Sequence, residues 1–418
     1  MKVLISHPTG NANMRAAAAG FLAAGILGEL NTAIATYPGT LLYWLSTFGP
    51  LSELRRRNFP PGLKPLTRQY PWKEAGRLAA SRAGMHAWTR HEKGRFCIDA
   101  VYHSLDDHVG KRLKRVVERQ IDAVYAYEDG ALESFRKAKE LGLPCFYDLP
   151  IGYWRAAKHL MEKEEASWPH WASTLTGLKD SKAKLARKDE ELRLADRIFV
   201  ASRFTATTLQ SFPESLGPVE IIPYGFPPVC DHRTYGTGHR FKPLRLLFVG
   251  GLSQRKGIAN LFAAVESLGR RVELTIVGNK ASNDCPALDT ALAKHRWIPS
   301  LPHAAVLELM QQHDVLVFPS LFEGFGLVIT EAMSQGTPVI TTDRTAGPDL
   351  IQQDENGWLV EAGSTAALQA AIEKLLQNPA LIAKAGREAR ETAHKRPWEV
   401  YGKELAAAVM KHKKPHKQ

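Results

Sequence analysis

Two glutamates stand on either side of a glycine-rich turn in the segment PSLFEGFGLVITEAMSQGTPVI, residues 319–340. Glu323 comes directly before the Gly-Phe-Gly turn, and Glu331 lies in the apolar stretch that follows it. Ionised carboxylates only accept hydrogen bonds, so hydroxyl groups are their natural partners. The glycines allow the backbone to approach a ligand closely, and a helix that begins there attracts phosphate to its free amides. These residue types fit a nucleotide-diphosphate sugar, which carries phosphates in its middle and hydroxyl-rich rings at both ends.

The flanking pattern places this turn at the end of a strand. The stretch 314–320 predicts a strand, and 327–336 predicts a helix that ends near Gly336. Ligands of doubly wound sheets bind outside the carboxyl ends of the strands, so this is a suitable place for a site. The alternative is a pair of solvated glutamates at a helix start, where acidic residues are common.

Short strand-like runs alternate with amphipathic helical runs along the whole chain. This alternation predicts parallel, doubly wound α/β sheets, and ten such runs are too many for one ordinary sheet. We therefore expect two Rossmann-like domains. The strand-like runs are residues 3–6, 32–37, 123–128, 144–149, 196–202, 245–250, 272–278, 314–320, 338–342 and 357–362.

A proline-rich stretch, residues 221–245, is the candidate boundary between the two domains. We expect an N-terminal domain over 1–228 and a C-terminal domain over 229–396.

Composition limits the classes of protein and partner. The 418 residues carry a formal charge of +12, which suggests a polyanionic partner such as nucleic acid, anionic lipid or a phosphorylated substrate. Four widely spaced cysteines indicate neither a zinc cluster nor a disulfide framework. No signal peptide or transmembrane stretch is expected, and a reducing cytoplasm is the simplest compartment.

Several ordered motifs together resemble family-four glycosyltransferases, which have the GT-B fold. Glu323 and Glu331 match the family's signature of a glutamate, seven residues and a second glutamate. LRLLFVGGLSQRKGIANLFAAV (244–265) and AGPDLIQQDENGWLV (346–360) also match. The resemblance is close over roughly residues 195–362 and weak in the first half. It implies two Rossmann-like domains that face each other across a cleft.

The resemblance also implies roles for individual residues of the second half. Glu323 would hold hydroxyls of the donor sugar, Glu331 would hold the ribose, and Lys256 would neutralise the leaving phosphate. The family often has an arginine five positions before that lysine, where this chain has Gly251; Arg255 could replace it, or could be an exposed loop cation. Further implied donor-binding residues are Gly250, Ile298, Ser300, Gly324, Phe325, Gly326 and Leu327.

In the first half the family has a glycine turn after the first strand, facing the acceptor. Gly10, Asn11 and Asn13 fit that place, although a structural turn with an asparagine cap is an alternative for the asparagines. Many members have a histidine after a later strand, where this chain offers Asp148, which could contact the sugar or could be an ordinary loop cap. His7 and His103 are other candidates, each with a structural role as the alternative.

Two further segments suggest contacts beyond the site, one with a membrane surface and one between the two domains. Residues 41–58, LLYWLSTFGPLSELRRRN, combine aromatics with arginines and could lie on a membrane surface, or could be a surface helix packed on a core. The C-terminal stretch 397–418 resembles the family's last helix, which crosses back to the first domain.

The resemblance thus implies a retaining glycosyltransferase, and the absence of an Asp-x-Asp pattern means that a metal-bridged diphosphate is not suggested. Its partners would be a nucleotide-sugar donor and a sugar, lipid-linked or small-molecule acceptor, in the cytoplasm or at the inner face of a membrane. The alternatives are a nucleotide-sugar epimerase or hydrolase on the same fold, or a basic nucleic-acid-binding protein. The last is disfavoured because no zinc finger, helix-turn-helix or RNA-recognition pattern is found.

Overall fold

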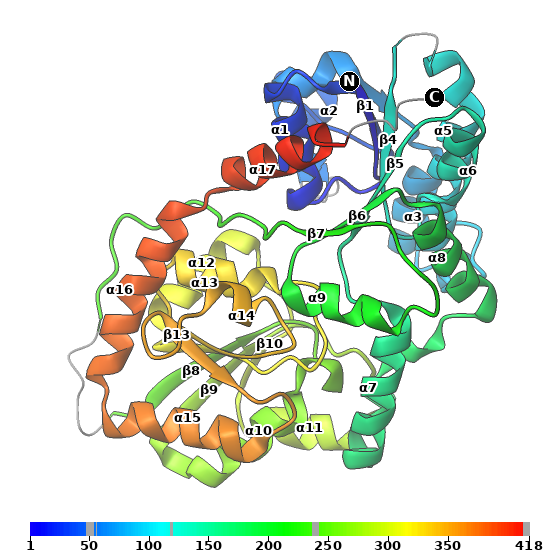
Figure 1. Ribbon diagram of the computed structural model, residues 1–418. Helices are drawn as coiled ribbons and strands as arrows, with labels where there is room; N and C mark the ends of the chain where they lie inside the picture. Colours follow the sequence, from blue (N-terminus) through cyan, green and yellow to red (C-terminus); the bar gives the residue numbers. More distant parts are fainter. Residues whose placement is uncertain (47–53, 56, 118–119, 236–241, 413–418) are drawn as a thin grey trace.

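The computed structural model describes residues 1–46, 54–55, 57–117, 120–235 and 242–412. Two parallel β-sheets, each flanked by helices, form two lobes that stack one above the other in Figure 1. The predicted fold class, α/β with two doubly wound domains, is confirmed.

The first sheet has seven strands in the order β3-β2-β1-β4-β5-β6-β7, and every neighbouring pair is parallel. The order reverses between β1 and β4, which makes these two strands the switch point of the sheet. The strands are β1 (Val3–Ser6), β2 (Leu27–Thr32), β3 (Thr67–Gln69), β4 (Ala123–Tyr127), β5 (Cys145–Leu149), β6 (Arg197–Val200) and β7 (Val219–Ile221). The α-helices of this half are α1 (Ala12–Ala23), α2 (Leu41–Leu45), α3 (Trp72–Arg82), α4 (His86–Thr89), α5 (Ile98–Val117), α6 (Leu132–Glu140), α7 (Trp154–Ser167), α8 (Lys182–Leu194) and α9 (Arg203–Thr208).

The second sheet has six strands in the order β10-β9-β8-β11-β12-β13, again all parallel, with its switch point between β8 and β11. The strands are β8 (Leu244–Val249), β9 (Val272–Val277), β10 (Arg296–Ile298), β11 (Val315–Phe318), β12 (Val339–Thr342) and β13 (Gly357–Val360). The helices are α10 (Ile258–Leu268), α11 (Pro286–Leu292), α12 (His303–Gln312), α13 (Leu327–Ser334), α14 (Gly347–Leu350), α15 (Thr365–Gln377), α16 (Ala380–Lys395) and α17 (Trp398–Met410).

One predicted strand is misplaced. The sequence pattern put it at residues 32–37, whereas the structure has β2 at Leu27–Thr32. Glu29 and Asn31 hide the pattern because they are polar yet buried, with Arg112 Nη1 3.2 Å from Glu29 Oε1. The short edge strands β3, β7 and β10 were also not predicted, since three residues are too few to show a period.

The last helix, α17, packs on α1 of the first lobe, as Figure 1 shows. Two glycines allow this close crossing: a Cβ on Gly20 would lie 2.2 Å from the carbonyl oxygen of Gly402. The described part of 222–243, between β7 and β8, contains no helix or strand. The two sheets therefore divide within this stretch, and the chain returns to the first lobe only at α17.

A second connection between the lobes was not predicted. The 3-10 helix η3 (Pro169–Thr174), which follows α7, packs against the second lobe, where Trp171 stacks on Phe262 with ring centroids 5.8 Å apart. Thr174 Oγ1 also accepts a hydrogen bond from the backbone N–H of Gln254 at 2.9 Å. Residues 154–174 thus belong to the first half of the chain but brace the second lobe.

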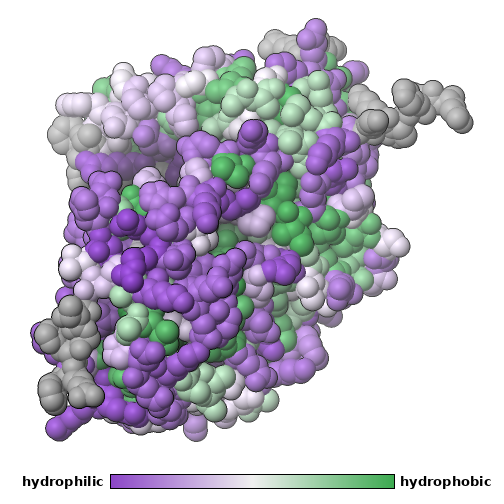
Figure 2. All heavy atoms as spheres, turned by 60° about the vertical axis from the view of Figure 1, so that its left-hand side comes forward, coloured by the Kyte–Doolittle hydropathy of each residue, from purple (hydrophilic) through white to green (hydrophobic). Residues whose placement is uncertain are grey.

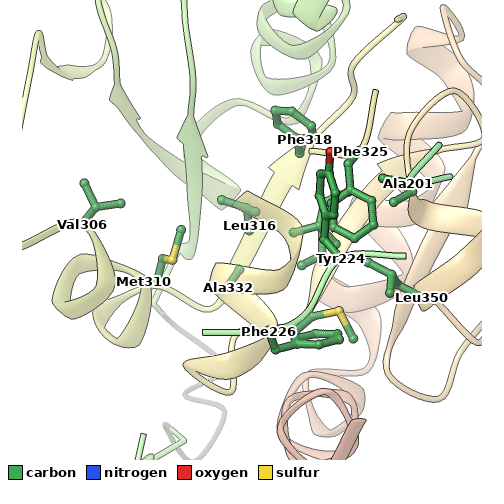
Figure 3. Close-up of a cluster of buried hydrophobic side chains, with 14 of the residues drawn as sticks. Ala201, Tyr224, Phe226, Val306, Met310, Leu316, Phe318, Phe325, Ala332 and Leu350 are labelled. Atoms are coloured by element: carbon green, nitrogen blue, oxygen red, sulfur yellow. The ribbon is translucent and has the colours of Figure 1, made fainter. Parts of the chain in front are cut away.

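An aromatic cluster fills the space between the lobes. The ring of Tyr224, from the connecting stretch, lies 4.9 Å from Phe325 and 5.2 Å from Tyr401, centroid to centroid. Figure 3 shows Tyr224 and Phe325 lying against each other, with Phe226 and Leu350 close by. Because Phe325 is the middle residue of the Gly-Phe-Gly turn, this cluster holds the turn in a buried core.

The surface seen in Figure 2 is mostly hydrophilic, with hydrophobic areas interspersed. Within the described ranges, every helix is either too short or too polar to cross a bilayer.

Candidate functional site

The glycine turn links β11 to α13 at the carboxyl edge of the second sheet. Gly326 has φ 87° and stands at the N-cap position of α13, where it offers no side chain to cap the first amides of the helix. A helix N-terminus of this kind binds anions because its amides point outward and its dipole is positive there. The predicted phosphate-facing segment, Gly324 to Leu327, therefore leads into a helix start whose amides lack a side-chain cap, and phosphate binding there stays a prediction.

Glu323 lies beside two cations at this edge. Lys256 Nζ contacts Glu323 Oε2, and Arg255 Nη1 lies 3.4 Å from the same oxygen. Burial alone would raise the pKa of Glu323, but the two cations outweigh it and lower the pKa below its usual value. Burial lowers the pKa of Lys256 in spite of Glu323. The site thus keeps an ionised carboxylate and holds its cations together at the switch point of the sheet.

Backbone hydrogen bonds fix Lys256 against Glu323. The loop after β8 forms the 3-10 helix η6 (Gln254–Lys256), and the carbonyl of Arg255 accepts the N–H of Leu321 at 2.9 Å. Gly257 follows with φ 68°, and a Cβ there would lie 2.1 Å from the carbonyl oxygen of Pro319. The lysine-bearing loop is pressed directly onto the loop that carries Glu323.

Arg255 is on the same side of the site as Lys256. Its Nη1 donates to the carbonyl of Phe322 at 2.7 Å, so the guanidinium is anchored and does not extend freely into solvent. Gly251 leaves open space, because a Cβ there would meet no atom within 4 Å. The replacement of the family arginine by Arg255 stays a prediction that this geometry permits.

Gly324 has a packing role of its own. A Cβ at this residue would lie 1.9 Å from the carbonyl oxygen of Pro150, in the loop after β5. The carbonyl of Gly324 accepts hydrogen bonds from Ser202 Oγ at 2.6 Å and Thr205 Oγ1 at 2.9 Å. The turn is therefore clamped by the first lobe. Sequence reasoning missed both hydroxyls, since SRFT reads only as an ordinary helix start.

Glu331 lies one turn further along α13 and has a partner that the sequence did not reveal. Its Oε1 is 3.0 Å from Nε2 of His303, the first residue of α12. This hydrogen bond raises the pKa of His303, while burial acts in the opposite direction. The 28-residue separation explains why no local pattern could indicate the pair.

The predicted base-binding segment begins with β10. Ile298 accepts the N–H of Gly278 at 3.0 Å, and Trp297 Nε1 donates to the carbonyl of Gly278 at 2.9 Å. Ser300 is exposed in the loop that leads to His303. Gly250 is tied to the same edge by its N–H, which donates to Val277 O at 2.9 Å. The geometry brings these residues to the carboxyl edge of the second sheet, and their roles remain predictions.

The predicted acceptor turn is held together by His7. Its Nδ1 accepts the backbone N–H groups of Thr9 and Gly10, each at 3.1 Å. Burial, followed by the charge of Arg57, lowers the pKa of His7 to about 3, so the ring is neutral. Gly10 has φ 62°, and a Cβ there would lie 2.4 Å from Phe59. His7 therefore serves the turn structurally, which agrees with the alternative stated for it.

Both asparagines have partners within the protein. Asn11 caps α1, accepting the N–H of Met14 at 3.1 Å. Asn13 donates from Nδ2 to the hydroxyl of Tyr224 at 3.0 Å, so it connects α1 to the aromatic cluster between the lobes. Acceptor binding by these residues stays a prediction.

Asp148 is buried at the carboxyl end of β5. Its Oδ2 accepts the hydroxyl of Tyr125 at 2.6 Å, and burial raises its pKa to about 7 against the effect of that hydrogen bond. Tyr224 and Tyr401 line the same small space. The carboxyl group points into this aromatic environment, which is the setting of a structural residue more than of an exposed sugar contact.

His103 also remains on the first lobe. Its Nε2 is buried without a hydrogen-bond partner among the described residues, and burial lowers its pKa, with Arg187 acting in the same direction. Its predicted role near the reacting sugar has no supporting contact.

Two other features lie outside this site. His91, Glu92 and Asp180 have metal-ligand spacing, but they belong to the first half and Lys184 Nζ is 3.3 Å from Asp180 Oδ1. A cavity of about 920 Å³ lies at the amino ends of β8, β9 and β10, where Arg245, Arg270 and His295 are among its lining residues. Ligands of doubly wound sheets bind at the opposite, carboxyl ends, so this cavity is not the candidate site.

Comparison with known proteins agrees with this geometry. Residues 236–392 match the family model described as Glycosyl transferases group 1. Glycogen synthase of Mycobacterium tuberculosis is 32% identical over 160 residues, which cover 36% of this chain and 38% of that protein. The matched part is therefore well under two thirds of the relative's own length. The resemblance predicted from the motifs is confirmed for the second lobe.

Solved structures resemble the whole chain. Sucrose-phosphate synthase from Thermosynechococcus elongatus superposes with a TM-score of 0.63 at 19% identity, covering 98% of each chain. HepE from Anabaena, in complex with UDP, superposes with a TM-score of 0.63 at 16% identity, covering 99% of this chain and 100% of that one. At these identities the likeness establishes the fold, and the predicted GT-B architecture is confirmed.

Proposed function

We propose that this chain, whose second lobe matches the group 1 glycosyl transferases, moves a sugar from a nucleotide-diphosphate sugar to a hydroxyl acceptor with retention of configuration. The observation that supports this most is the arrangement at the second switch point. There, Lys256 and Arg255 face Glu323 beside the uncapped N-terminus of α13, and Glu331 lies further along the same helix.

In the proposed reaction the protein positions the reactants and stabilises charge. The diphosphate lies at the amides of α13, where Lys256 and Arg255 neutralise the charge that develops on the leaving group. The bond between the anomeric carbon and the phosphate oxygen breaks as the acceptor oxygen bonds to that carbon from the same face. The departing phosphate takes the proton of the acceptor hydroxyl, so the step needs no separate base.

Glu323 would exchange partners when the donor binds. Its carboxylate contacts Lys256 in this structure, and donor phosphates would compete for that lysine. The freed carboxylate oxygens would then accept hydroxyls of the donor sugar. Before the donor binds, the contact between Lys256 and Glu323 would keep both side chains charged and close together. The donor would then replace each of them as the other's partner.

UDP is the first nucleotide to test, because the Anabaena neighbour was solved with UDP. Thermal unfolding would be followed with UDP-, GDP- and ADP-sugars in turn. A ligand that binds only the folded protein raises its apparent unfolding temperature. If none of these compounds raises it, the proposed function is wrong. A hit would be followed with candidate acceptors, and the anomeric configuration of the product would be read by NMR.

Two of the three proteins reported above are named as synthases, which supports transfer over the epimerase or hydrolase alternative. Product analysis without an acceptor tests this, because an epimerase converts the donor alone. Nothing in the site favours the nucleic-acid alternative either.

Metal independence is a further part of the proposal. Lys256, Arg255 and the N-terminus of α13 supply the positive charge that a divalent ion supplies to diphosphates elsewhere. Transfer should therefore persist in excess EDTA. Loss of transfer with EDTA and recovery with Mg²⁺ or Mn²⁺ would contradict this part.

Contact with an anionic membrane surface is the last part of the proposal. Apolar side chains are exposed on the first lobe, including Trp72 at 83%, Leu41 at 72% and Trp88 at 44%. Residues 61–95 carry eight lysines and arginines against two glutamates. Exposed aromatics beside cations suit an anionic lipid surface. Of the predicted segment 41–58, residues 47–53 and 56 lie outside the described residues.

Co-sedimentation with vesicles tests this contact. Binding should increase with the fraction of anionic phosphatidylglycerol and decrease in Trp72→Ala. Ile221→Ala is the matched control. Ile221 is also an exposed apolar residue, but it lies on β7, whereas Trp72 follows β3 at the opposite edge of the same sheet. Equal binding to neutral and anionic vesicles, or no binding, would favour a soluble sugar or small-molecule acceptor.

A further inference from the structure

His303 and Glu331 form a partly exposed pair at the start of α12. The two atoms that meet, Nε2 and Oε1, are 3.0 Å apart, and the side chains are 62% and 22% exposed respectively. The pair is therefore accessible to a ligand bound at the carboxyl edge of the second sheet. The contact with His303 uses Oε1 of Glu331 and leaves Oε2 for a ligand.

The helices α12 and α13 do not depend on this pair for their packing. At their other end, Gln311 Nε2 donates to Gln335 Oε1 at 2.6 Å. Thr337 Oγ1 donates to the carbonyl of Met310 at 2.7 Å. Since these contacts already join α12 to the end of α13, the main effect of the contact with His303 is on the orientation of the Glu331 carboxylate.

The charge of His303 depends on the same carboxylate. Its hydrogen bond with Glu331 raises the pKa of His303, burial opposes this, and the charge of Glu331 adds to the increase. Among the described residues, Glu331 is the charged group that acts on His303. Protonated His303 is therefore favoured in the folded protein below the raised pKa, and it loses its charge as the pH rises through that value.

We propose that His303 is a positioning residue, whose imidazolium holds Oε1 of Glu331 so that Oε2 points to a ribose hydroxyl of the donor nucleotide. Because Glu331 binds ribose only if the proposed function holds, the inference rests on that function. One consequence is specific: nucleotide affinity should decrease as the pH rises and His303 becomes neutral. A purely structural contact would not give this dependence.

Calorimetric titration of the full chain with UDP, and with GDP and ADP in parallel, tests the inference between pH 6 and pH 9. His303→Ala should raise the Kd by about two- to fivefold at pH 6, as fits a partly exposed ion pair. Its Kd should then change little between pH 6 and pH 9, whereas the wild-type Kd should increase. His303→Gln keeps a neutral donor, so its Kd should be intermediate and equally insensitive to pH.

Two variants separate positioning from other effects. Gln311→Ala cuts the far contact between the same helices without touching Glu331, and it should leave the pH dependence of the Kd intact. In a Glu331→Gln background, His303→Ala should cause no further loss. Thermal unfolding of each variant shows that it is folded.

The results distinguish a failure of the role proposed for His303 from a failure of the proposed function. If the wild type binds a nucleoside diphosphate but His303→Ala keeps both its Kd and its pH dependence, the role of His303 is wrong and the proposed function stands. Equal effects of Gln311→Ala and His303→Ala would likewise show that helix packing alone matters. If the wild type binds none of the three nucleotides, the proposed function fails first.

Discussion

The two switch points of the molecule have the same topology but differ in what their charged groups bind. At β8 and β11, the loops bring Lys256, Arg255 and Glu323 together as charged groups. At β1 and β4, the corresponding turn holds the neutral ring of His7, and the nearby cation, Arg57, donates from Nη1 to the carbonyls of Pro8 and Thr9 at 3.4 and 3.3 Å. Sheet topology therefore fixes where a ligand can lie, and the loop residues decide which charge it can carry.

The difference fits a division of labour between the lobes. A diphosphate needs cations and free amides, and the second lobe has both. In the turn after β1, by contrast, Arg57 and His7 both bind backbone groups of the turn itself, so the cation there stabilises the turn. Substitutions at the two edges and where the lobes meet test this difference.

The largest effect is expected at the charged edge. Lys256→Ala and Glu323→Gln should each lower kcat by about 100-fold or more, because each removes charge or hydrogen bonding at the reacting groups. Turnover of the donor measures this, with circular dichroism to show that the fold persists. Near-normal transfer by both variants would contradict the site.

The second effect concerns the pH dependence of stability at the first lobe. The pKa of Asp148 is raised from 3.8 to about 7, so the folded state binds its proton more tightly than the unfolded state. The contribution of Asp148 is most favourable below about pH 4 and decreases as the pH rises to about 7, by up to about 4 kcal/mol. Urea unfolding of the wild type and Asp148→Asn between pH 4 and pH 8 measures the difference.

Asp148→Asn should thus become more stable than the wild type, relative to pH 4, as the pH approaches 8. The same variant tests the catalytic alternative for Asp148. A large loss of kcat with unchanged stability would place the carboxylate in contact with the sugar, against the buried setting seen here.

A third, smaller effect is expected where the lobes meet. Gly324→Ala places a Cβ against the Pro150 carbonyl and should cost about 1–3 kcal/mol of unfolding free energy, as overpacking does. Gly251→Ala is the matched control, because its Cβ meets no atom within 4 Å. Equal stability of the two variants would show that the lobes do not pack as described.

The smallest effect is expected for the hydroxyl clamp. Ser202→Ala and Thr205→Ala each remove one hydrogen bond to the Gly324 carbonyl and should cost about 0.5–1.5 kcal/mol. The double variant should cost more than the sum, since each single variant leaves the buried Gly324 carbonyl one donor and the double variant leaves it neither. Chemical unfolding measures these values, and full additivity would argue against a shared clamp.

Sequence reasoning succeeded where the pattern was regular and local. The strands of the second lobe, such as 245–250 and 314–320, show apolar runs bounded by glycine and proline, and they lie where the pattern placed them. It misplaced β2 because Glu29 and Asn31 are polar side chains inside a sheet, satisfied by a distant arginine. A partly buried ion pair between residues 83 positions apart has no signature in a short window of the sequence.

The motif residues at the site were predicted, and their partners were not. Glu331 could be named from the signature, but His303 could not, because nothing in PSLPHAAV marks that histidine as the partner of a carboxylate. The same holds for η3, because no local pattern indicates that Trp171 packs against Phe262 of the second lobe.

Local patterns in the sequence therefore predict the alternation of strands and helices, the glycine turn between two carboxylates and the lysine that precedes them. These features depend on backbone conformation and local period, which neighbouring residues set. Which distant groups meet depends on the folded chain: Lys256 contacts Glu323, His303 contacts Glu331, and Ser202 donates to the Gly324 carbonyl 122 residues away. Such pairs form because packing brings distant edges together, and their charge and hydrogen bonding follow from burial that no single segment has alone.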